Sequence, residues 1–354
     1  MQDKVYLDFL KYALNDDIPL PQSSSSIDWM KMMEWAERQT VVGMIYMGIE
    51  KAGKSLLIPF DSLMAWVSYA QQIEMQNRLL NRGCVIVTKE LKGDGLECLI
   101  LKGQGNGTTY PNPARRTPGD IDVLVKGVSR RCLTEYVKTR KNVRGLHYEH
   151  IEYEEECIPV EIHFKPGVIN NPFYNRRLQS WYKEHSECLI VELPDEIGSI
   201  PIPSCRFNII FQLGHMMHHF FDEGIGLRQF VDYYFLLKSD VRSQMDDVSS
   251  TLKYLGLWKF AGAVMYVMSE VFALDEQYMV APVDERRGKV LLQEIMRGGN
   301  FGKYDESNIK ADNRIKKNIQ RIKRDIRMMQ YFPSECLWEP VFRAYHFFWR
   351  LVYR

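Results

Sequence analysis

Apolar positions divide the chain into helix-like ends and a middle part with strand-like alternation. Near the start, Trp29, Met32, Met33 and Ala36 recur at intervals of three and four residues. This spacing predicts an amphipathic helix. A second, longer helix is predicted from Pro59 to a glycine at position 83, where it would end. We therefore expect an N-terminal helical region over residues 1–84, which shows no chemistry of its own.

Residues 85–204 mix both periods, which is typical of a layered α/β unit. A helix is expected over residues 85–94, and another over residues 130–141, where Ser129 is a suitable N-cap. Four short runs rich in β-branched and aromatic residues predict strands, at residues 98–101, 120–125, 146–153 and 158–164. The last two would form a hairpin around an acidic turn. The proline-containing stretch 171–204 is expected to be an irregular connection.

Residues 205–354 return to helical spacing. Five apolar residues recur at intervals of four and three within residues 309–329, and the remaining faces of this segment carry lysines and arginines. The aromatic end, residues 342–353, is expected to dock in the core. The whole pattern predicts an α+β fold in which a small mixed sheet, residues 85–204, lies between two helical regions.

Composition indicates a globular protein but does not indicate its function. The 354 residues carry a formal net charge of +1, with 45% hydrophobic and 26% charged residues. These values are ordinary for a globular protein and give no overall attraction to nucleic acid or membrane. No apolar run reaches the length of about 20 residues that crosses a bilayer. Seven cysteines without CxxC spacing favour a reducing compartment, so we expect a cytoplasmic location.

Candidate chemistry is concentrated between the first two predicted strands. Asp120 and Asp122 alternate with Ile121 and Val123, so the two carboxylates share one strand face. Adjacent carboxylates repel each other unless a cation lies between them. Magnesium prefers such oxygen ligands together with phosphate and water. A solvated acidic strand is the alternative interpretation of so short a pattern.

Basic and glycine residues flank these carboxylates. Lys102 and Gly103 directly follow the first strand, and Arg115 and Arg116 precede the second. Lysine and arginine offer positive charge to phosphates. Gly103 would let the backbone approach a ligand closely.

One stretch of the chain contains Leu101-Lys102-Gly103, Tyr110, Arg116 and the run Gly-Asp-Ile-Asp-Val-Leu-Val at 119–125. This stretch resembles the signature of the uncharacterised bacterial nucleotidyltransferase family. That family belongs to the DNA-polymerase-beta-like nucleotidyltransferase superfamily. The resemblance covers roughly residues 30–300. It implies that Asp120 and Asp122 bind Mg²⁺ or Mn²⁺, and that Lys102, Gly103 and Arg116 bind an NTP. The superfamily usually carries Gly-Ser after the first strand, whereas here Lys102-Gly103 is followed by no serine.

The resemblance also implies a third carboxylate on a neighbouring strand. Glu161 stands at the matching position, and His163 shares its strand face. Three carboxylates can hold the metal ions of such a site, and Glu161 would also be a candidate general base. His163 would either orient Glu161 or contact the nucleotide. The alternative is a strand histidine that a neighbouring residue satisfies.

A histidine-rich helix further along the chain has three possible interpretations. His215, His218 and His219 share one helical face, which suits a metal site poorly because no third ligand has firm spacing. They would otherwise lie in the core or line the nucleotide pocket. The resemblance favours the pocket and adds Arg228 to the NTP-binding residues. Arg228 and Asp232 are four residues apart, so a simple helix ion pair is the alternative.

We thus expect a nucleotidyltransferase that moves a nucleoside monophosphate from an NTP to an acceptor hydroxyl and releases pyrophosphate. The acceptor remains open among small molecules, proteins and RNA, and the basic segment 309–329 is a possible nucleic-acid contact. The rival interpretation is a non-catalytic nucleotide- or RNA-binding protein with the same fold. If the carboxylates repel one another, Asp122→Asn should leave metal-free stability unchanged or higher.

Overall fold

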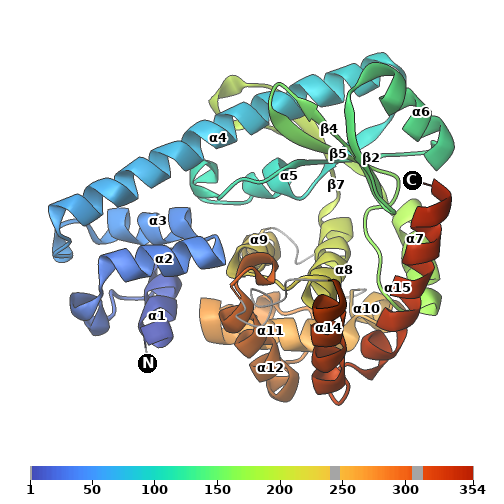
Figure 1. Ribbon diagram of the computed structural model, residues 1–354. Coiled ribbons are helices and arrows are strands. Elements are labelled where there is room, and N and C mark those ends of the chain that lie inside the picture. The colour runs from blue at the N-terminus through green and yellow to red at the C-terminus, as the bar shows by residue number, and fades with distance from the viewer. Residues whose placement is uncertain (1, 240–247, 305–313, 354) are drawn as a thin grey trace.

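A five-stranded mixed sheet forms the centre of one half of the molecule (Figure 1). The computed structural model describes residues 2–239, 248–304 and 314–353. The strands follow the order β1-β2-β5-β4-β3, in which β2 and β5 are parallel and the other neighbours are antiparallel. Their bounds are β1 Cys98–Leu101, β2 Ile121–Val125, β3 Val143–Leu146, β4 His150–Glu155 and β5 Ile158–His163. The α+β class with a mixed sheet and helical flanks is confirmed.

The long helix α4, Phe60–Gly93, joins the sheet to the N-terminal helices (Figure 1). It corrects the expectation of two helices separated at Gly83. A Cβ atom at Gly83 would lie 2.8 Å from the Ile121 side chain, so this glycine lets α4 approach the sheet rather than ending a helix. The boundary expected between residues 84 and 85 thus falls inside one continuous helix.

One face of the sheet is apolar and packs against α4 and α6, Arg130–Arg140. Val160 and Ile162 lie on this buried face, as their alternation predicted. Ser129 caps α6 as expected, because its side chain accepts a hydrogen bond from the backbone N–H of Cys132. The opposite face carries the polar residues of the strands and faces the C-terminal helices.

Residues 171–204 are ordered secondary structure rather than an irregular connection. They form α7, Pro172–Glu184, and a two-stranded hairpin of β6, Cys188–Glu192, and β7, Ser199–Pro203. Asn171 caps α7 by accepting hydrogen bonds from two backbone N–H groups. The prolines were misleading because Pro172 occupies the first turn of a helix, where its missing N–H costs nothing.

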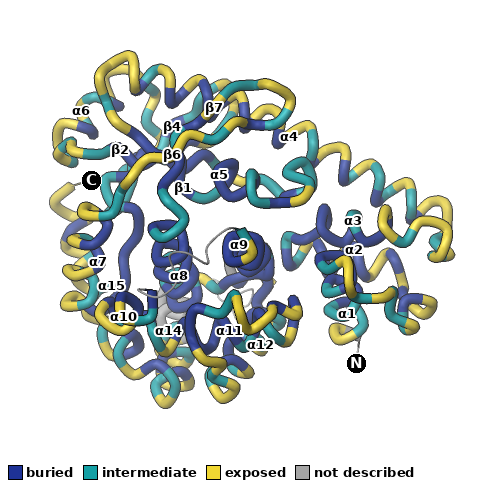
Figure 2. The backbone as a smooth tube through the Cα atoms, turned by 180° about the vertical axis from the view of Figure 1, so that it is seen from behind, coloured by how far each residue is buried: buried dark blue, intermediate teal, exposed yellow. Residues whose placement is uncertain are grey.

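Helices make up the remainder of the described chain. Figure 2 shows α8 and α9 buried in the centre of the C-terminal half. The helices on the N-terminal side are α1 Gln2–Leu14, α2 Trp29–Gln39 and α3 Val42–Ala52. The short α5, Gly103–Gly107, follows β1. On the C-terminal side are α8 Cys205–Asp222, α9 Leu227–Lys238, α10 Val248–Tyr254, α11 Trp258–Phe272, α12 Glu285–Gly298, α14 Arg314–Met328 and α15 Pro333–Tyr353.

Helix α14 turns its apolar side outward, which corrects the expected packing of this segment. Ile319, Ile322 and Ile326 are 48%, 49% and 68% exposed. Arg324 instead points inward and donates to the backbone carbonyls of Phe221 and Asp222 at the end of α8. A cation at a helix C-terminus is favourable because the last carbonyls lack helical partners.

The aromatic end of the chain is also more exposed than expected. In α15, Phe347, Phe348 and Leu351 lie on the surface, whereas Trp349 is buried against Tyr148. The expected docking in the core is therefore wrong for most of these side chains. Among the described residues, no helix is both long and apolar enough to cross a membrane.

Candidate active site

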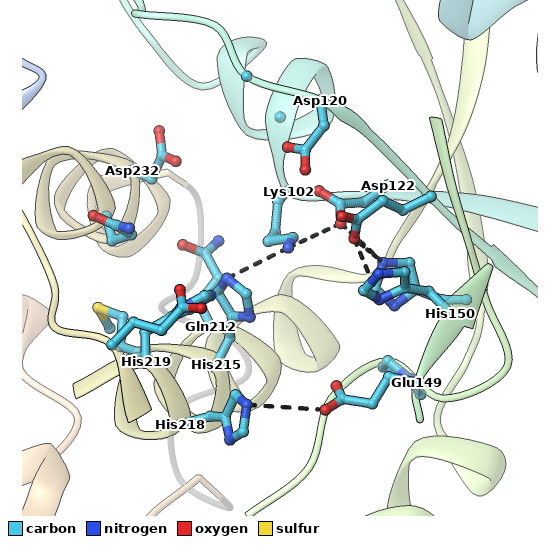
Figure 3. Close-up of a pocket in the computed structure, with 18 of the residues that line it drawn as sticks. Lys102, Asp120, Asp122, Glu149, His150, Gln212, His215, His218, His219 and Asp232 are labelled. Atoms are coloured by element: carbon cyan, nitrogen blue, oxygen red, sulfur yellow. Dashed lines mark hydrogen bonds and ion pairs between the residues drawn. The ribbon is translucent and has the colours of Figure 1, made fainter. Parts of the chain in front are cut away.

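A cavity of about 420 Å³ opens between the polar face of the sheet and helices α8 and α9. Its size is within the range typical of ligand pockets. The wall is unusually rich in imidazole: of the eight histidines in the chain, all except His185 line this cavity. In Figure 3, Asp120 and Asp122 lie on one side and His215, His218 and His219 on the other, with Lys102 between them.

Strand pairing brings the predicted carboxylates together. Asp122 on β2 lies directly opposite Glu161 on the parallel strand β5, and Asp120 immediately precedes β2. One oxygen from each of the three carboxylates lies within 4.8 Å of the others. The predicted convergence is therefore confirmed. Asp120, Asp122 and Glu161 are called the open carboxylate cluster below, because no arginine pairs with them among the described residues.

The pKa values of the two aspartates in this cluster are shifted in opposite directions. The negative charge of Asp122, together with burial, raises the pKa of Asp120 to about 6. Burial acts in the same direction on Asp122. There Lys102 and His163 outweigh it, and the pKa of Asp122 lies well below its ordinary value. The electrostatic strain is therefore concentrated on Asp120, while the charge of Asp122 is stabilised by the fold.

Two cations hold Asp122 in place. The Lys102 Nζ lies 3.0 Å from Asp122 Oδ1, and His163 Nε2 lies 2.9 Å from the same oxygen. Lys102 adopts φ 51°, a backbone conformation that costs a non-glycine residue energy and that clusters at functional sites. The expectation that Asp122→Asn would leave stability unchanged or higher is therefore not supported by this geometry. Asp120 is the residue to which that argument applies.

His163 bridges two carboxylates. Its Nε2 also lies 3.2 Å from Glu161 Oε2, and its Nδ1 lies 3.2 Å from the carbonyl oxygen of Lys165. Burial opposes protonation of His163, but its hydrogen bonds to the two carboxylates raise its pKa to about 9. Both ring nitrogens are engaged, which favours the orienting role over contact with a nucleotide.

The open carboxylate cluster fits a hard divalent cation. All three donors are carboxylate oxygens, the ligands that Mg²⁺ and Mn²⁺ prefer. The raised pKa of Asp120 shows that Lys102 and His163 do not balance the negative charge for all three groups. A bound cation would supply the missing charge. Metal identity and the ligand roles of these residues stay predictions.

Arg116 is engaged with a carboxylate from α9. Its Nε and Nη2 donate to the two oxygens of Asp232 at 2.8 and 2.9 Å, and the Tyr110 hydroxyl donates to the same carboxylate at 2.5 Å. All three side chains are buried. Arg116, Asp232 and Tyr110 are called the closed ion cluster below. Asp232 thus pairs with Arg116 and not with Arg228, so the alternative of a simple helix ion pair between Arg228 and Asp232 does not describe this contact.

Arg228 is better placed than Arg116 to meet an anion. It borders the cavity, and its Nη1 lies 3.3 Å from the Pro118 carbonyl, beside Gly119. Its buried Nε has no hydrogen-bond partner among the residues that the structure describes, and neither has Nη1 of Arg116. The two arginines differ because Arg116 is ion-paired with Asp232, whereas no ion pair holds Arg228 among the described residues. Burial lowers the pKa of Arg228, and the neighbouring charge of Arg116 adds to this. Arg115, by contrast, pairs with Glu50 and Glu74 outside the cavity.

The histidines of α8 form the wall opposite the carboxylates. His215 Nε2 lies 3.4 Å from Lys102 Nζ, and His218 Nε2 lies 3.9 Å from Glu149 Oε1 (Figure 3). Burial, with the positive charge of Lys102, keeps the pKa of His215 well below its ordinary value. A neutral imidazole can accept a hydrogen bond from Lys102. Of the three interpretations of this helix, the pocket-lining one agrees with the structure.

Three residues at the mouth of the cavity were not identified from the sequence: His147, His150 and Glu152. Glu152 pairs with Glu161 across β4 and β5, and His150 pairs with His163. The polar alternation of β4 was a usable signal, but only the strand register shows that it continues the polar face of β2 and β5.

In the basic segment, the three arginines whose side chains the structure describes are engaged within the protein. Arg321 lies 3.2 Å from Asp222, Arg324 contacts α8, and Arg327 lies 2.8 Å from Glu294. Residues 309–313 and the side chains of residues 314–318 and 320 lie outside the described part. Contact with nucleic acid through residues 309–329 remains a prediction.

Comparison with known proteins places the chain in a family. A solved structure that it resembles is an antigenic nucleotidyltransferase-like protein from Paracoccidioides brasiliensis, with 12% identity, a TM-score of 0.39, and coverage of 58% of this chain and 95% of that one. Among curated proteins, none matches significantly. Residues 25–273, more than half of the chain, match the model of a family described as uncharacterised nucleotidyltransferase. The chain therefore belongs to this family of uncharacterised nucleotidyltransferases.

Proposed function

We propose that this protein is a metal-dependent nucleotidyltransferase of the DNA-polymerase-beta-like kind. In the proposed reaction an acceptor hydroxyl oxygen forms a bond to the α-phosphorus of an NTP. The bond between the α-phosphorus and the bridging oxygen breaks, and pyrophosphate leaves with the electron pair. The acceptor proton passes to a base. The family match supports the reaction class, and the open carboxylate cluster supports the dependence on metal.

The proposed roles follow from position and charge. Asp120, Asp122 and Glu161 would hold Mg²⁺ or Mn²⁺, which stabilises charge on the phosphates and activates the acceptor oxygen. Arg228 and Lys102 would meet the triphosphate. Glu161 is half-buried, like Asp120, and is the candidate to accept the acceptor proton.

The single observation that carries this proposal is the convergence of three carboxylates in one cavity, where the charge of Asp122 and burial raise the pKa of Asp120. A protein that only binds nucleotides has no need of such an arrangement, because like charges destabilise the metal-free fold. The non-catalytic alternative rests on the absence of Gly-Ser after β1. In this protein Lys102 stands in that place, and its ammonium group forms an ion pair with Asp122. Lys102 would therefore hold Asp122 in position in a site that lacks Gly-Ser.

The test is transfer of label from each α-labelled NTP to fractions of a cell extract, with Mg²⁺ or Mn²⁺. We expect wild-type protein to label one fraction and Asp122→Asn to lose about 100-fold or more in rate, because a metal ligand contributes several kcal/mol to transition-state stabilisation. Arg115→Gln is the matched control, since Arg115 lies outside the cavity. Nucleotide binding by wild type without transfer to any fraction would favour the non-catalytic alternative.

A further inference from the structure

A second group of potential metal ligands lies at the mouth of the cavity, outside the open carboxylate cluster. His147, in the turn after β3, and His150 and Glu152, on β4, each offer one ligand atom, and these atoms lie within 4.8 Å of one another. The side chains are partly exposed, so an ion can reach them from solvent. The reaction proposed above gives these residues no role.

The distances resemble those between ligands on one metal ion. Glu152 Oε1 lies 3.0 Å from His147 Nε2 and 3.2 Å from His150 Nε2. Ligands bound tetrahedrally to zinc at 2.0–2.1 Å are about 3.3 Å apart. Two imidazoles and one carboxylate form the ligand set of one class of catalytic zinc sites. Imidazole ligands favour zinc over magnesium, which prefers oxygen.

The other nitrogen of His150 faces a carboxylate at ion-pair distance, as the second nitrogen of a zinc-bound histidine often does. Its Nδ1 lies 3.4 Å from Glu161 Oε2, so a carboxylate faces the ring on the side away from Glu152. Metal-bound histidines almost always donate their second N–H to such a group, which fixes the tautomer and the ring orientation. The arrangement links the mouth of the cavity to the open carboxylate cluster.

The backbone leaves room for these ligands. A β-bulge interrupts the pairing of β3 with β4 between Val143 and Gly145. A Cβ atom at Gly145 would lie 2.7 Å from His147 Nε2 and 2.9 Å from Glu152 Oε2. Any side chain there would therefore push the two ligand atoms out of place, since real Cβ atoms do not approach so closely.

We propose that His147, His150 and Glu152 form a binding site for an imidazole-preferring divalent metal such as Zn²⁺. The ligands are His147 Nε2, His150 Nε2 and a Glu152 oxygen. The fourth position would be taken by water. Occupancy would fix His150 against Glu161. This site does not depend on the proposed transfer reaction, and its test needs no nucleotide.

The experiment is competition for Zn²⁺ between the purified full chain and a chromogenic chelator, with Co²⁺ absorption as a second readout. We expect wild type to bind one Zn²⁺, and His147→Ala and Glu152→Gln to bind it at least about 10-fold more weakly, because each lacks a ligand. Gly145→Ala keeps every ligand and should also weaken binding. Glu154→Gln is the matched control, since Glu154 lies on the same strand and pairs with Arg144.

Unchanged zinc affinity in both His147→Ala and Glu152→Gln would overturn the proposal. Zinc held by the open carboxylate cluster or by His163 would give that result, because neither variant touches those groups. Circular dichroism of each variant identifies any loss of fold. Gly145→Ala provides an independent result if a ligand variant fails to fold. Loss of transfer in Asp122→Asn, measured separately, reports on the proposed function and not on this site.

Discussion

The cavity contains two buried ionic clusters that differ in how their charge is balanced. In the closed ion cluster, Asp232 accepts two hydrogen bonds from Arg116 and one from Tyr110. Burial alone would raise the pKa of Asp232, but Arg116 and Tyr110 lower it. In the open carboxylate cluster, Asp120 keeps a raised pKa despite Lys102. The charges of Arg116 and Asp232 are paired with each other in the first cluster, whereas the charge on Asp120 in the second cluster is not fully compensated.

This difference separates a structural role from a functional one more clearly than residue type does. Arg116 has the chemistry of a phosphate ligand, but its charge is already matched by a carboxylate. Arg228 lies in the same cavity, and among the described residues no carboxylate forms an ion pair with it. An uncompensated buried group costs free energy, and proteins retain such groups mainly where a ligand completes them.

The largest expected effect is on the closed ion cluster. Asp232→Ala removes the partner of a fully buried guanidinium and should lower the free energy of unfolding by about 3–5 kcal/mol. Urea denaturation in the absence of nucleotide measures this change. The double variant Arg116→Met with Asp232→Leu should lose less, because no charge is left unpaired. A native-like stability of Asp232→Ala together with lost nucleotide binding would instead place Asp232 in the functional site.

The next effect concerns the phosphate ligand. Arg228→Gln should weaken binding of an NTP with Mg²⁺ by about 10- to 100-fold, because a hydrogen bond to a charged group contributes about 1.5–3 kcal/mol. Calorimetry with each NTP in turn measures this affinity. Arg115→Gln is the control and should bind normally, since Arg115 pairs with Glu50 away from the cavity. Equal affinities for the two variants would exclude Arg228 as a phosphate ligand.

The smallest expected effect is a difference in the free energy of unfolding between variants of the two aspartates of the open carboxylate cluster. In chelator at pH 7, Asp122→Asn should lose about 1–2 kcal/mol, because Lys102 and His163 stabilise its charge. Asp120→Asn should be unchanged or more stable by about 0.5–2 kcal/mol, because it relieves repulsion. Urea denaturation of both variants beside wild type tests this contrast. Losses of equal size in the two variants would show that Asp120 is not strained.

The pH dependence of that contrast has a defined sign. The folded-state pKa of Asp120 is raised from 3.8 to about 6, so folding favours its protonated form. The stability that this provides is present below about pH 4 and is lost as the pH rises to about 6. The advantage of Asp120→Asn over wild type should therefore be present at pH 7 and absent at pH 4. A constant difference between the two proteins would point to a cause other than charge.

The local sequence pattern was sufficient to predict the strands that carry the open carboxylate cluster. The alternation of Asp120 with Ile121 and of Glu161 with Ile162 depends only on the two-residue period of a strand, so their faces were readable in the sequence. The cap at Ser129 is equally local, because a cap contacts residues within one turn. The α+β class follows from the same periodicities.

At some positions the local sequence is compatible with more than one structure, and tertiary packing determines which of them forms. Glycine is common at helix ends, but Gly83 lies within α4. It is needed there because the Ile121 side chain of the sheet comes too close for a Cβ atom. The isoleucines of α14 predict a buried face, but the carbonyl groups at the end of α8 hold Arg324 inward instead. Such choices depend on a neighbour far away in the chain, which no local period encodes.

The sequence by itself determined which residues carry chemistry on each strand, because side-chain direction is a property of the local backbone. Only the tertiary structure decided which of them meet. Arg116 pairs with Asp232 across 116 residues, and Lys102 lies beside His215 across 113. The row of Asp122, Glu161 and Glu152 exists because β2, β5 and β4 are neighbours in one register. The charge balance at each carboxylate depends on those long-range pairings, because the energy of a Coulomb interaction depends on the distance between two charges in space. Their separation along the sequence does not enter.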